Sequence, residues 1–234
     1  MSNVAIIPAR GGSKRIPRKN IKDFCGQPIM AYSIKAALNS GLFDEVMVST
    51  DDDEIAGVAK RFGASVPFMR SAKTSDDFAT TADVLTEVID EYDKRGRAFD
   101  CVACIYPTAP FVTADKLRTA FERLRQSDAD MLMPVVKFSY PPQRALVMRD
   151  GSLEYKWPEN YPRRSQDLEP FYHDVGQFYF HRRSSFTAAR DGGGLALKIV
   201  PMLMDEIEVQ DIDNLSDWEL AELKFKLMVE RAGN

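Results

Sequence analysis

Five cations and two glycines crowd into one short loop near the N-terminus that contains no acidic residue. The loop spans residues 9–20, and its cations are Arg10, Lys14, Arg15, Arg18 and Lys19. Gly11 and Gly12 would allow backbone amides to approach an anion closely, and the cations would neutralise its charge. A triphosphate needs several such charges, so the loop predicts a polyphosphate site. The alternative is a solvated basic turn, in which the cations would repel one another.

Two aspartates stand two residues apart near the C-terminal end of the chain. Residues 208–213 resemble the end of a strand, which would place Asp211 and Asp213 on one face. Carboxylates that face together repel unless a cation lies between them, and Mg²⁺ is usually held by one or two carboxylates plus phosphates and water. The pair therefore predicts a magnesium site. The alternative is capping of the final helix, for which Ser216 and Glu219 already supply an S-x-x-E pattern.

Several other chemistries find little support. The basic loop lacks both G-x-G-x-x-G and G-x-x-x-x-G-K-[ST], which disfavours a dinucleotide-binding oxidoreductase and a P-loop protein. Cys101 and Cys104 lie in a strand-like run, where positions three apart face opposite sides, so buried free thiols are expected. His173 and His181 stand apart from any Cys/His cluster, which gives zinc no support. No Ser/His/Asp triad is visible, which argues against a hydrolase.

Short β-branched runs alternate with amphipathic stretches over the first 138 residues. The expected strands are 3–8, 45–50, 65–69, 99–106 and 131–138, and the expected helices are 28–40, 52–62, 80–95 and 113–126. This alternation predicts an α/β fold with a mostly parallel sheet covered by helices on both faces. Ligands bind at the carboxyl ends of the strands in such a sheet, which is where the basic loop would lie.

The pattern changes in residues 139–170, where Asp150-Gly151 between two strand-like runs predicts a hairpin. Strands at 175–180 and 195–203 and a helix from 214 to about 230 then complete one domain over residues 1–234, with 139–170 as an inserted lobe. The apolar side chains of this lobe fit a buried interface better than a free hairpin, so a homodimer is expected.

Composition narrows the partners. The 35 acidic and 31 basic residues give a net charge of −4, which argues against a nucleic-acid binder with a broad basic face. The chain opens with only a five-residue apolar run, far short of a signal segment or a membrane-spanning helix. We therefore expect a cytoplasmic protein with no membrane partner.

The segment AIIPARGGSKRIPRKNI resembles the opening motif of CMP-sialic acid synthetases, and the likeness continues to the end of the chain. YPTAPF and RRSQDLEPFYHDVGQFYF favour the branch of that family that activates pseudaminic acid. The resemblance implies a Rossmann-like fold of the nucleotide-diphospho-sugar-transferase type, CTP as donor, a nine-carbon acidic sugar as acceptor and Mg²⁺ as cofactor. N-acetylneuraminate and 3-deoxy-octulosonate remain alternative acceptors, and a catalytically inactive nucleotide-binding protein is the alternative of a different class.

The resemblance also implies roles for single residues. The nucleotide would contact Arg10, Gly11, Gly12, Ser13, Lys14, Lys19, Asn20, Arg70 and Ala79, of which Asn20 would reach the ribose and Arg70 the cytosine. Arg10, Lys19, Asp211 and Asp213 would be catalytic, with the two aspartates as metal ligands. The sugar hydroxyl would attack the α-phosphate of CTP, and pyrophosphate would leave in line.

The acceptor side would involve Thr81, Tyr106, Arg164 and Gln177. Tyr106 stands where the family more usually has glutamine, and Val175 precedes Gly176 where the family has asparagine. Both departures fall at sugar-facing positions, so they disfavour N-acetylneuraminate. Arg164 would pair with the sugar carboxylate, because a planar guanidinium can hold a carboxylate with two hydrogen bonds.

Overall fold

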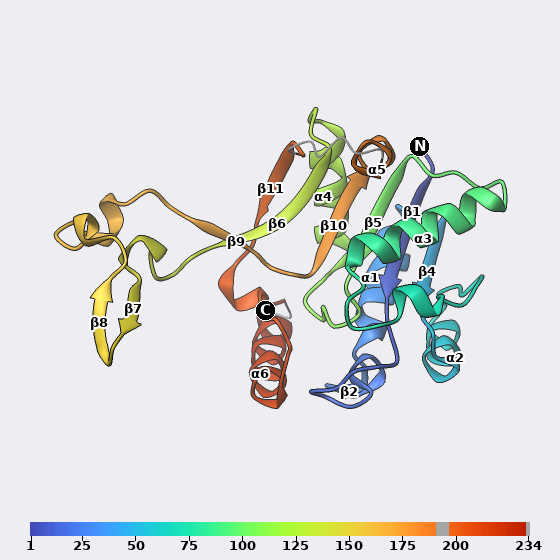
Figure 1. Ribbon diagram of the computed structural model, residues 1–234. Coiled ribbons are helices and arrows are strands. Elements are labelled where there is room, and N and C mark those ends of the chain that lie inside the picture. Colours follow the sequence, from blue (N-terminus) through green and yellow to red (C-terminus); the bar gives the residue numbers. More distant parts are fainter. Residues whose placement is uncertain (191–196, 233–234) are drawn as a thin grey trace.

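The computed structural model describes residues 1–190 and 197–232 and is built around a seven-stranded sheet (Figure 1). Its strands are β1 (Asn3–Pro8), β4 (Glu45–Ser49), β5 (Cys101–Ile105), β6 (Met131–Lys137), β9 (Tyr172–Asp174), β10 (Phe178–Arg182) and β11 (Ile199–Leu203). Six strands follow the order β11-β6-β10-β5-β1-β4, and β9 pairs with β6. Only β9 and β10 run against the others among the described strands, so the prediction of a mostly parallel sheet is confirmed.

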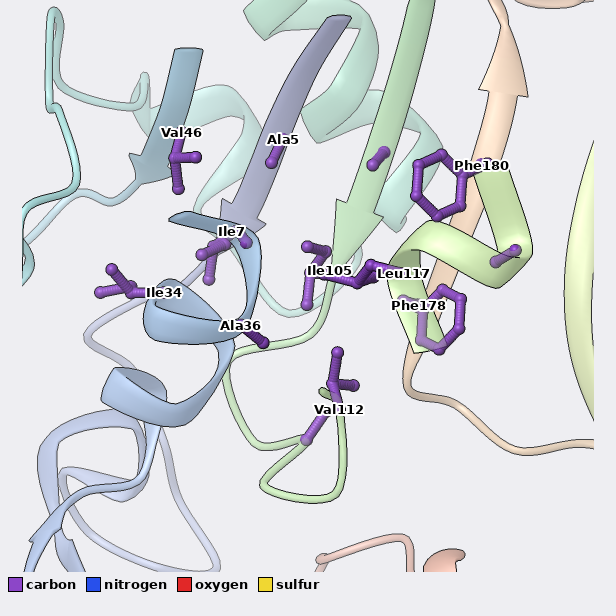
Figure 2. Close-up of a cluster of buried hydrophobic side chains, with 14 of the residues drawn as sticks. Ala5, Ile7, Ile34, Ala36, Val46, Ile105, Val112, Leu117, Phe178 and Phe180 are labelled. Carbon is purple, nitrogen blue, oxygen red and sulfur yellow. The ribbon is translucent and has the colours of Figure 1, made fainter. Parts of the chain in front are cut away.

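Helices cover both faces of the sheet. They are α1 (Met30–Ser40), α2 (Asp53–Arg61), α3 (Thr81–Lys94), α4 (Ala114–Arg125), α5 (Arg183–Arg190) and α6 (Leu215–Ala232). One buried cluster joins α1, α2 and α4 to side chains such as Ile7 and Phe178, and Figure 2 shows its centre. The cluster on the opposite face contains Leu85 and Val88 of α3. No helix of the described residues is long and apolar enough to cross a membrane.

The two cysteines of β5 confirm the predicted alternation. Cys101 belongs to the first cluster and Cys104 to the second, so they face opposite sides of the sheet. Burial raises the pKa of the Cys101 thiol to about 12, and it also raises that of Cys104. Both thiols are free and protonated at neutral pH, which suits packing and not redox chemistry.

Three predicted strands differ from the structure. Residues 65–69 make only an isolated bridge between Met47 and Ser65, since Pro67 lacks an N–H for a ladder. The strand predicted at 175–180 begins at Phe178, because Gly176 turns the chain with a φ of 62°. The strand predicted at 195–203 begins at Ile199, and residues 195–196 lie outside the described residues.

The predicted hairpin in residues 139–170 is confirmed. Strands β7 (Leu146–Arg149) and β8 (Ser152–Tyr155) pair in antiparallel fashion, and Asp150 and Gly151 join them with φ values of 48° and 80°. Positive φ at both central residues suits the twist of a two-residue hairpin turn. Figure 1 shows this lobe projecting away from the sheet beyond β9, whereas the short hairpin of β2 (Asp23–Phe24) and β3 (Gln27–Pro28) lies near α6.

Candidate active site

A cavity of about 450 Å³ lies at the carboxyl ends of β1 and β5, where the sequence places the basic loop. Ten of the predicted site residues line it, namely Arg10, Ser13, Lys14, Lys19, Asn20, Arg70, Ala79, Thr81, Tyr106 and Asp213. They come from four separate segments of the chain. The edge of the sheet therefore gathers cations, hydroxyl groups and the carboxylates of Asp76, Asp77 and Asp213 around one space, at the position where such a sheet binds its ligand.

Carboxylates from other loops neutralise the basic loop. Arg10 lies 3.1 Å from a carboxylate oxygen of Asp77, and Lys14 pairs with the same carboxylate. Arg15 Nη2 lies 2.7 Å from Asp213 Oδ1. These three cations therefore have carboxylate partners within the protein and do not need a bound anion to offset their mutual repulsion. The hydrogen bond and charge of Lys14 hold the pKa of Asp77 below its usual value, so this carboxylate is an anion within the cavity.

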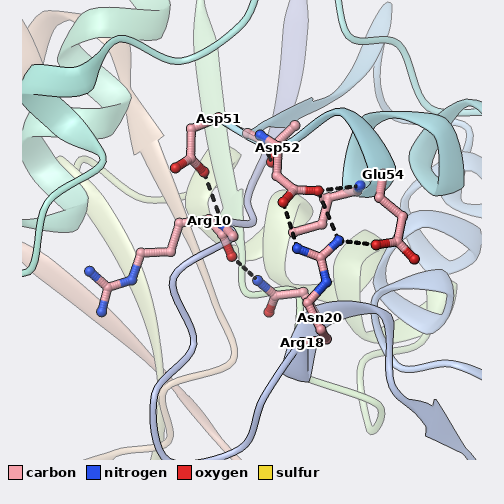
Figure 3. A network of polar contacts seen from close by, with 9 residues as sticks. Arg10, Arg18, Asn20, Asp51, Asp52 and Glu54 are labelled. Atoms are coloured by element: carbon pink, nitrogen blue, oxygen red, sulfur yellow. Dashed lines mark hydrogen bonds and ion pairs between the residues drawn. The ribbon is translucent and has the colours of Figure 1, made fainter.

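Arg18 does not line the cavity, and its side chain contacts the start of α2 (Figure 3). Its guanidinium donates to Asp52 at 2.5 and 3.0 Å and pairs with Glu54. Asp52 in turn accepts from the backbone N–H of Ile55 and caps α2. This hydrogen bond from Arg18 is the main reason that the pKa of Asp52 falls to about 2. Arg18 therefore serves the fold.

Gly11 contacts a carboxylate of the protein, and the predicted contact of both glycines with a nucleotide stays a prediction. The backbone N–H of Gly11 donates to Asp51 Oδ1 at 2.9 Å, so a carboxylate of the protein already accepts from this amide. A Cβ at Gly11 would lie 2.9 Å from Asp52 Oδ2, which explains the glycine as a close approach of the loop to α2. Neither Gly11 nor Gly12 lines the cavity.

Lys19 and Asn20 fix the far end of the loop. Asn20 is buried and donates from Nδ2 to the carbonyl of Arg10 at 2.9 Å, which closes the loop on itself (Figure 3). Lys19 Nζ donates to the carbonyl of Ile212 at 2.6 Å. Burial lowers the pKa of Lys19, while Asp213 and Asp211 act in the opposite direction. Lys19 thus links the basic loop to the acidic segment.

The two aspartates do not lie on a strand. A short 3-10 turn, Glu206–Glu208, leads into irregular chain, with Ile212 buried between Asp211 and Asp213. Asp213 lines the main cavity, whereas Asp211 lines a separate hollow of about 240 Å³. Polar and buried residues alternate here because Ile212 packs against Trp218 and Ala221 of α6, and not because the segment joins the sheet.

The cap of α6 also differs from the prediction. Asp217 Oδ2 accepts from the backbone N–H groups of Asp213 and Asn214, and Asn214 Oδ1 accepts from that of Asp217. Asn214 and Asp217 therefore form the capping pair in place of Ser216 and Glu219. The carboxylate of Asp213 is not used in this cap and pairs instead with Arg15 at the cavity.

No group of three or more metal-ligating side chains is assembled among the described residues. Of the two predicted ligands, Asp213 lines the main cavity and Asp211 does not, so the protein would offer one of these carboxylates there. Substrate phosphates and water would have to complete a Mg²⁺ shell, which is a common mode of binding for this ion. The donors present therefore agree with a magnesium ion that arrives with a nucleotide.

Arg70 forms a rigid wall of the cavity. It is buried, and its guanidinium donates to Ser49 Oγ at 3.1 Å and to the Ser49 carbonyl at 2.6 Å. Desolvation by burial lowers its pKa. Nearby, Thr80 caps α3 in a capping box with Asp83, so Thr81 begins the helix at the cavity wall. Thr81 Oγ1 and Tyr106 Oη are 3.2 Å apart.

A second cavity of about 440 Å³ adjoins the first and shares Thr81 and Tyr106 with it. Its other walls include Leu85, Met131, Met133, Asp174, Tyr179, His181 and Phe186. Tyr179 Oη donates to Asp174 Oδ2 at 2.5 Å, which places one polar contact in a mostly apolar space. Asp174 and Tyr179 were not predicted from the sequence as site residues. Their position beside Gly176 was the one feature of the sequence that could have indicated them.

Two predicted sugar contacts lie elsewhere. Gln177 is buried, donates from Nε2 to the Glu208 carbonyl at 2.6 Å, and accepts from the backbone N–H of Tyr106 at 2.8 Å. It therefore links the acidic segment to Tyr106 and does not line either of these two cavities. Arg164 lies in the lobe and pairs with Asp167 at 2.8 Å, so one chain does not bring it to the cavity.

The chain is similar to known proteins in both sequence and fold. A family model described as cytidylyltransferase matches residues 4–191. A pseudaminic acid cytidylyltransferase of Campylobacter jejuni is 42% identical, over 99% of this chain and 100% of that one. A CMP-N,N'-diacetyllegionaminic acid synthase of Legionella pneumophila is 34% identical, over 98% of this chain and 99% of that one. A solved CMP:2-keto-3-deoxy-manno-octonic acid synthetase complexed with CTP is 20% identical, covers 99% and 100%, and has a TM-score of 0.71, which shows a shared fold.

Proposed function

Because this chain belongs to the cytidylyltransferase family, we propose that it transfers CMP from CTP to the anomeric hydroxyl of pseudaminic acid and releases pyrophosphate. The observation that carries this proposal is the single cavity in which the basic loop, Arg70 and Asp213 meet at the carboxyl ends of the strands. Such a space suits a nucleoside triphosphate, since the cations of the loop would face its phosphates and the buried Arg70 would lie beside its base.

Charge is the main contribution of the protein to this reaction. Arg10, Lys14 and Lys19 would hold the triphosphate, and Arg10 and Lys19 would offset the charge that develops on the departing pyrophosphate. Asp213, with Asp211, would hold Mg²⁺. Magnesium bound there supplies further neutralisation of the phosphates.

The second cavity supports an acceptor that carries apolar substituents. It shares Thr81 and Tyr106 with the nucleotide cavity, so a sugar placed there would lie next to the nucleotide, and the reaction would require its anomeric end to face that cavity. Met131, Met133 and Leu85 would pack against apolar groups, while Asp174 and Tyr179 would receive a polar one. Two relatives are named for pseudaminic acid and a diacetylated legionaminic acid, which agrees with such a space.

The test is pyrophosphate release by the full chain with Mg²⁺, CTP and each of three acceptors: pseudaminic acid, N-acetylneuraminate and 3-deoxy-octulosonate. We expect pseudaminic acid to be preferred over N-acetylneuraminate by up to about 10⁴-fold in kcat/KM, because a wrong sugar leaves buried polar groups unpaired. Comparable efficiency with both would refute the acceptor and leave the family intact. Binding of CTP without turnover of any sugar would favour the inactive nucleotide-binding protein.

The donor is tested in the same assay by replacing CTP with UTP, ATP or GTP. We expect CTP to be used far better than the other three, since Arg70 forms a fixed wall beside the proposed base site. Equal turnover of UTP would contradict the role of Arg70 in cytosine recognition.

We also propose that the enzyme works in the cytoplasm, where CTP is available, as one cytidylyltransferase domain over residues 1–234 and as a homodimer. The lobe at 139–170 supports the dimer, because Met148 and Leu153 are 74% and 62% exposed on its hairpin. Arg164 could then meet the sugar carboxylate of the other subunit.

A further inference from the structure

Glu87 of α3 lies outside the nucleotide cavity, yet it holds a segment that forms one of its walls. Its carboxylate accepts three hydrogen bonds: from the backbone N–H of Ser71 at 2.8 Å, from Ser71 Oγ at 2.5 Å, and from Thr74 Oγ1 at 2.7 Å. Glu87 therefore anchors the chain immediately after Arg70 to a helix that covers one face of the sheet.

The anchored segment supplies much of the cavity. Arg70, Thr74, Asp76 and Asp77 all line it, and Ser71 stands between the first two of these. Ser71 is the N-cap of the short turn Ala72–Thr74, but its side chain makes no capping bond and donates to Glu87 in its place. The position of the turn is thus set by a contact to α3 and not by its own cap.

Glu87 is held in its charged form. Burial by itself would raise the pKa of its carboxyl group, but the hydrogen bonds from Ser71 and Thr74, together with the charge of Arg70, bring the pKa below its usual value. A charged acceptor makes stronger hydrogen bonds than a neutral one, so these three contacts form a firm anchor. The neighbouring turn of α3 offers a contrast, since Glu91 pairs only locally with Lys94 and Arg95 in the contacts described.

We propose that Glu87 is a positioning residue for the cytosine end of the nucleotide, which fixes the segment from Arg70 to Thr74 against α3. The proposal rests on the proposed function, because it assigns the cytosine to the wall that Arg70 forms. Glu87 would not touch CTP. It would act by keeping Arg70 and Thr74 where the base requires them.

The test compares Glu87→Ala with Glu91→Ala in the full chain, which changes the same residue type one helical turn apart. For Glu87→Ala we expect the KM for CTP to rise at least about tenfold, as loss of charge-assisted contacts implies, and the preference for CTP over UTP to narrow. The KM for the acidic sugar should stay within twofold of the parent. Glu91→Ala should match the parent in all three measurements.

Two further variants separate positioning from general loss of structure. Glu87→Gln keeps one acceptor oxygen and should restore part of the affinity for CTP. Ser71→Ala removes one donor, and its effect should be much smaller in the Glu87→Ala background, because both changes break the same contact. Additive effects, a CTP KM within twofold of the parent, or equal rises in KM for CTP and sugar would overturn the proposal. If the parent itself releases no pyrophosphate, the proposed function fails. The role of Glu87 would then be tested by measuring CTP binding with calorimetry. Unchanged CTP binding in Glu87→Ala would overturn that role.

Discussion

Arg18 and Lys19 are neighbours with opposite tasks. Arg18 adopts a left-handed backbone with a φ of 55° and turns its side chain to the start of α2, whereas Lys19 extends into the cavity. A count of cations in the sequence cannot separate these tasks, because the separation depends on which carboxylates the folded chain brings near. Charge density in a loop therefore predicts an anion site better than it predicts the residues that form it.

Replacement of Lys19 by Ala should lower kcat/KM for CTP by about 10- to 100-fold, since a charge-assisted contact to phosphate is lost. Lys22→Ala is the matched control, because Lys22 lies over the ring of Trp218 and does not line the cavity. Steady-state pyrophosphate release measures both variants. Activity within twofold of the parent for Lys19→Ala would show that this lysine serves only its contact with the Ile212 carbonyl.

Asp77 pairs with both Arg10 and Lys14, so in the proposed site it would compete with the nucleotide for these cations. Asp77→Asn should therefore lower the KM for CTP by about two- to fivefold, the range expected for an exposed ion pair. The gain should shrink as salt rises, since salt screens the competing carboxylate. A higher KM in Asp77→Asn would show instead that Asp77 helps to bind the nucleotide. Titration of CTP at low and high salt measures the effect.

Two aspartates near the start of α6 have different expected tasks: Asp217 caps the helix, and Asp213 would take part in the reaction. Asp217→Ala should cost about 1 kcal/mol of stability through loss of a helix cap, and lower Tm by roughly 2–4 °C, while turnover changes little. Asp213→Asn should do the opposite, because Asp213 gives only its backbone N–H to the cap. Thermal melting and turnover against Mg²⁺ concentration measure both. Near-normal turnover of Asp213→Asn would remove this residue from the proposed metal site.

Elements with strong local signals could be predicted from the sequence. The helix predicted at 80–95 became Thr81–Lys94, because a capping box and a regular apolar face agree there. The strand predicted at 65–69 was wrong, because Pro67 in its middle has no N–H to donate to a neighbouring strand. Asp211 and Asp213 resembled a strand only because Ile212 between them is buried against α6.

The site could be predicted only in part, for a related physical reason. Residues within one motif, such as the basic loop, carry their own signal of charge and spacing. Asp77, Glu87 and Tyr179 matter through partners far away in the sequence, as when Glu87 binds Ser71 or Tyr179 donates to Asp174. Such contacts arise from the packing of α3 and β10 beside the cavity, and no local sequence pattern predicts them.

In the whole molecule, the lobe at 139–170 is the part whose exposed apolar side chains are not covered by the rest of the same chain. Its hairpin exposes Leu146 as well as Met148 and Leu153, and it projects away from the sheet (Figure 1). An isolated two-stranded hairpin is at best marginally stable in water. A second copy of the chain that covers these side chains would supply the missing burial and would bring Arg164 near another cavity.

Lysine substitution of Met148 and Leu153 together should therefore convert a dimer into monomers, because charge would have to be buried at the interface. Leu38→Lys on α1 is the control, since this leucine is also exposed but lies outside the lobe. Sedimentation equilibrium measures the mass, and pyrophosphate release measures the consequence. If Arg164 acts across the dimer, the monomeric variant should keep its affinity for CTP and lose affinity for the sugar carboxylate, as should Arg164→Ala in the intact dimer. A monomeric parent with full activity would contradict both the dimer and the role of Arg164, whereas a dimeric double-lysine variant would place the interface on another surface.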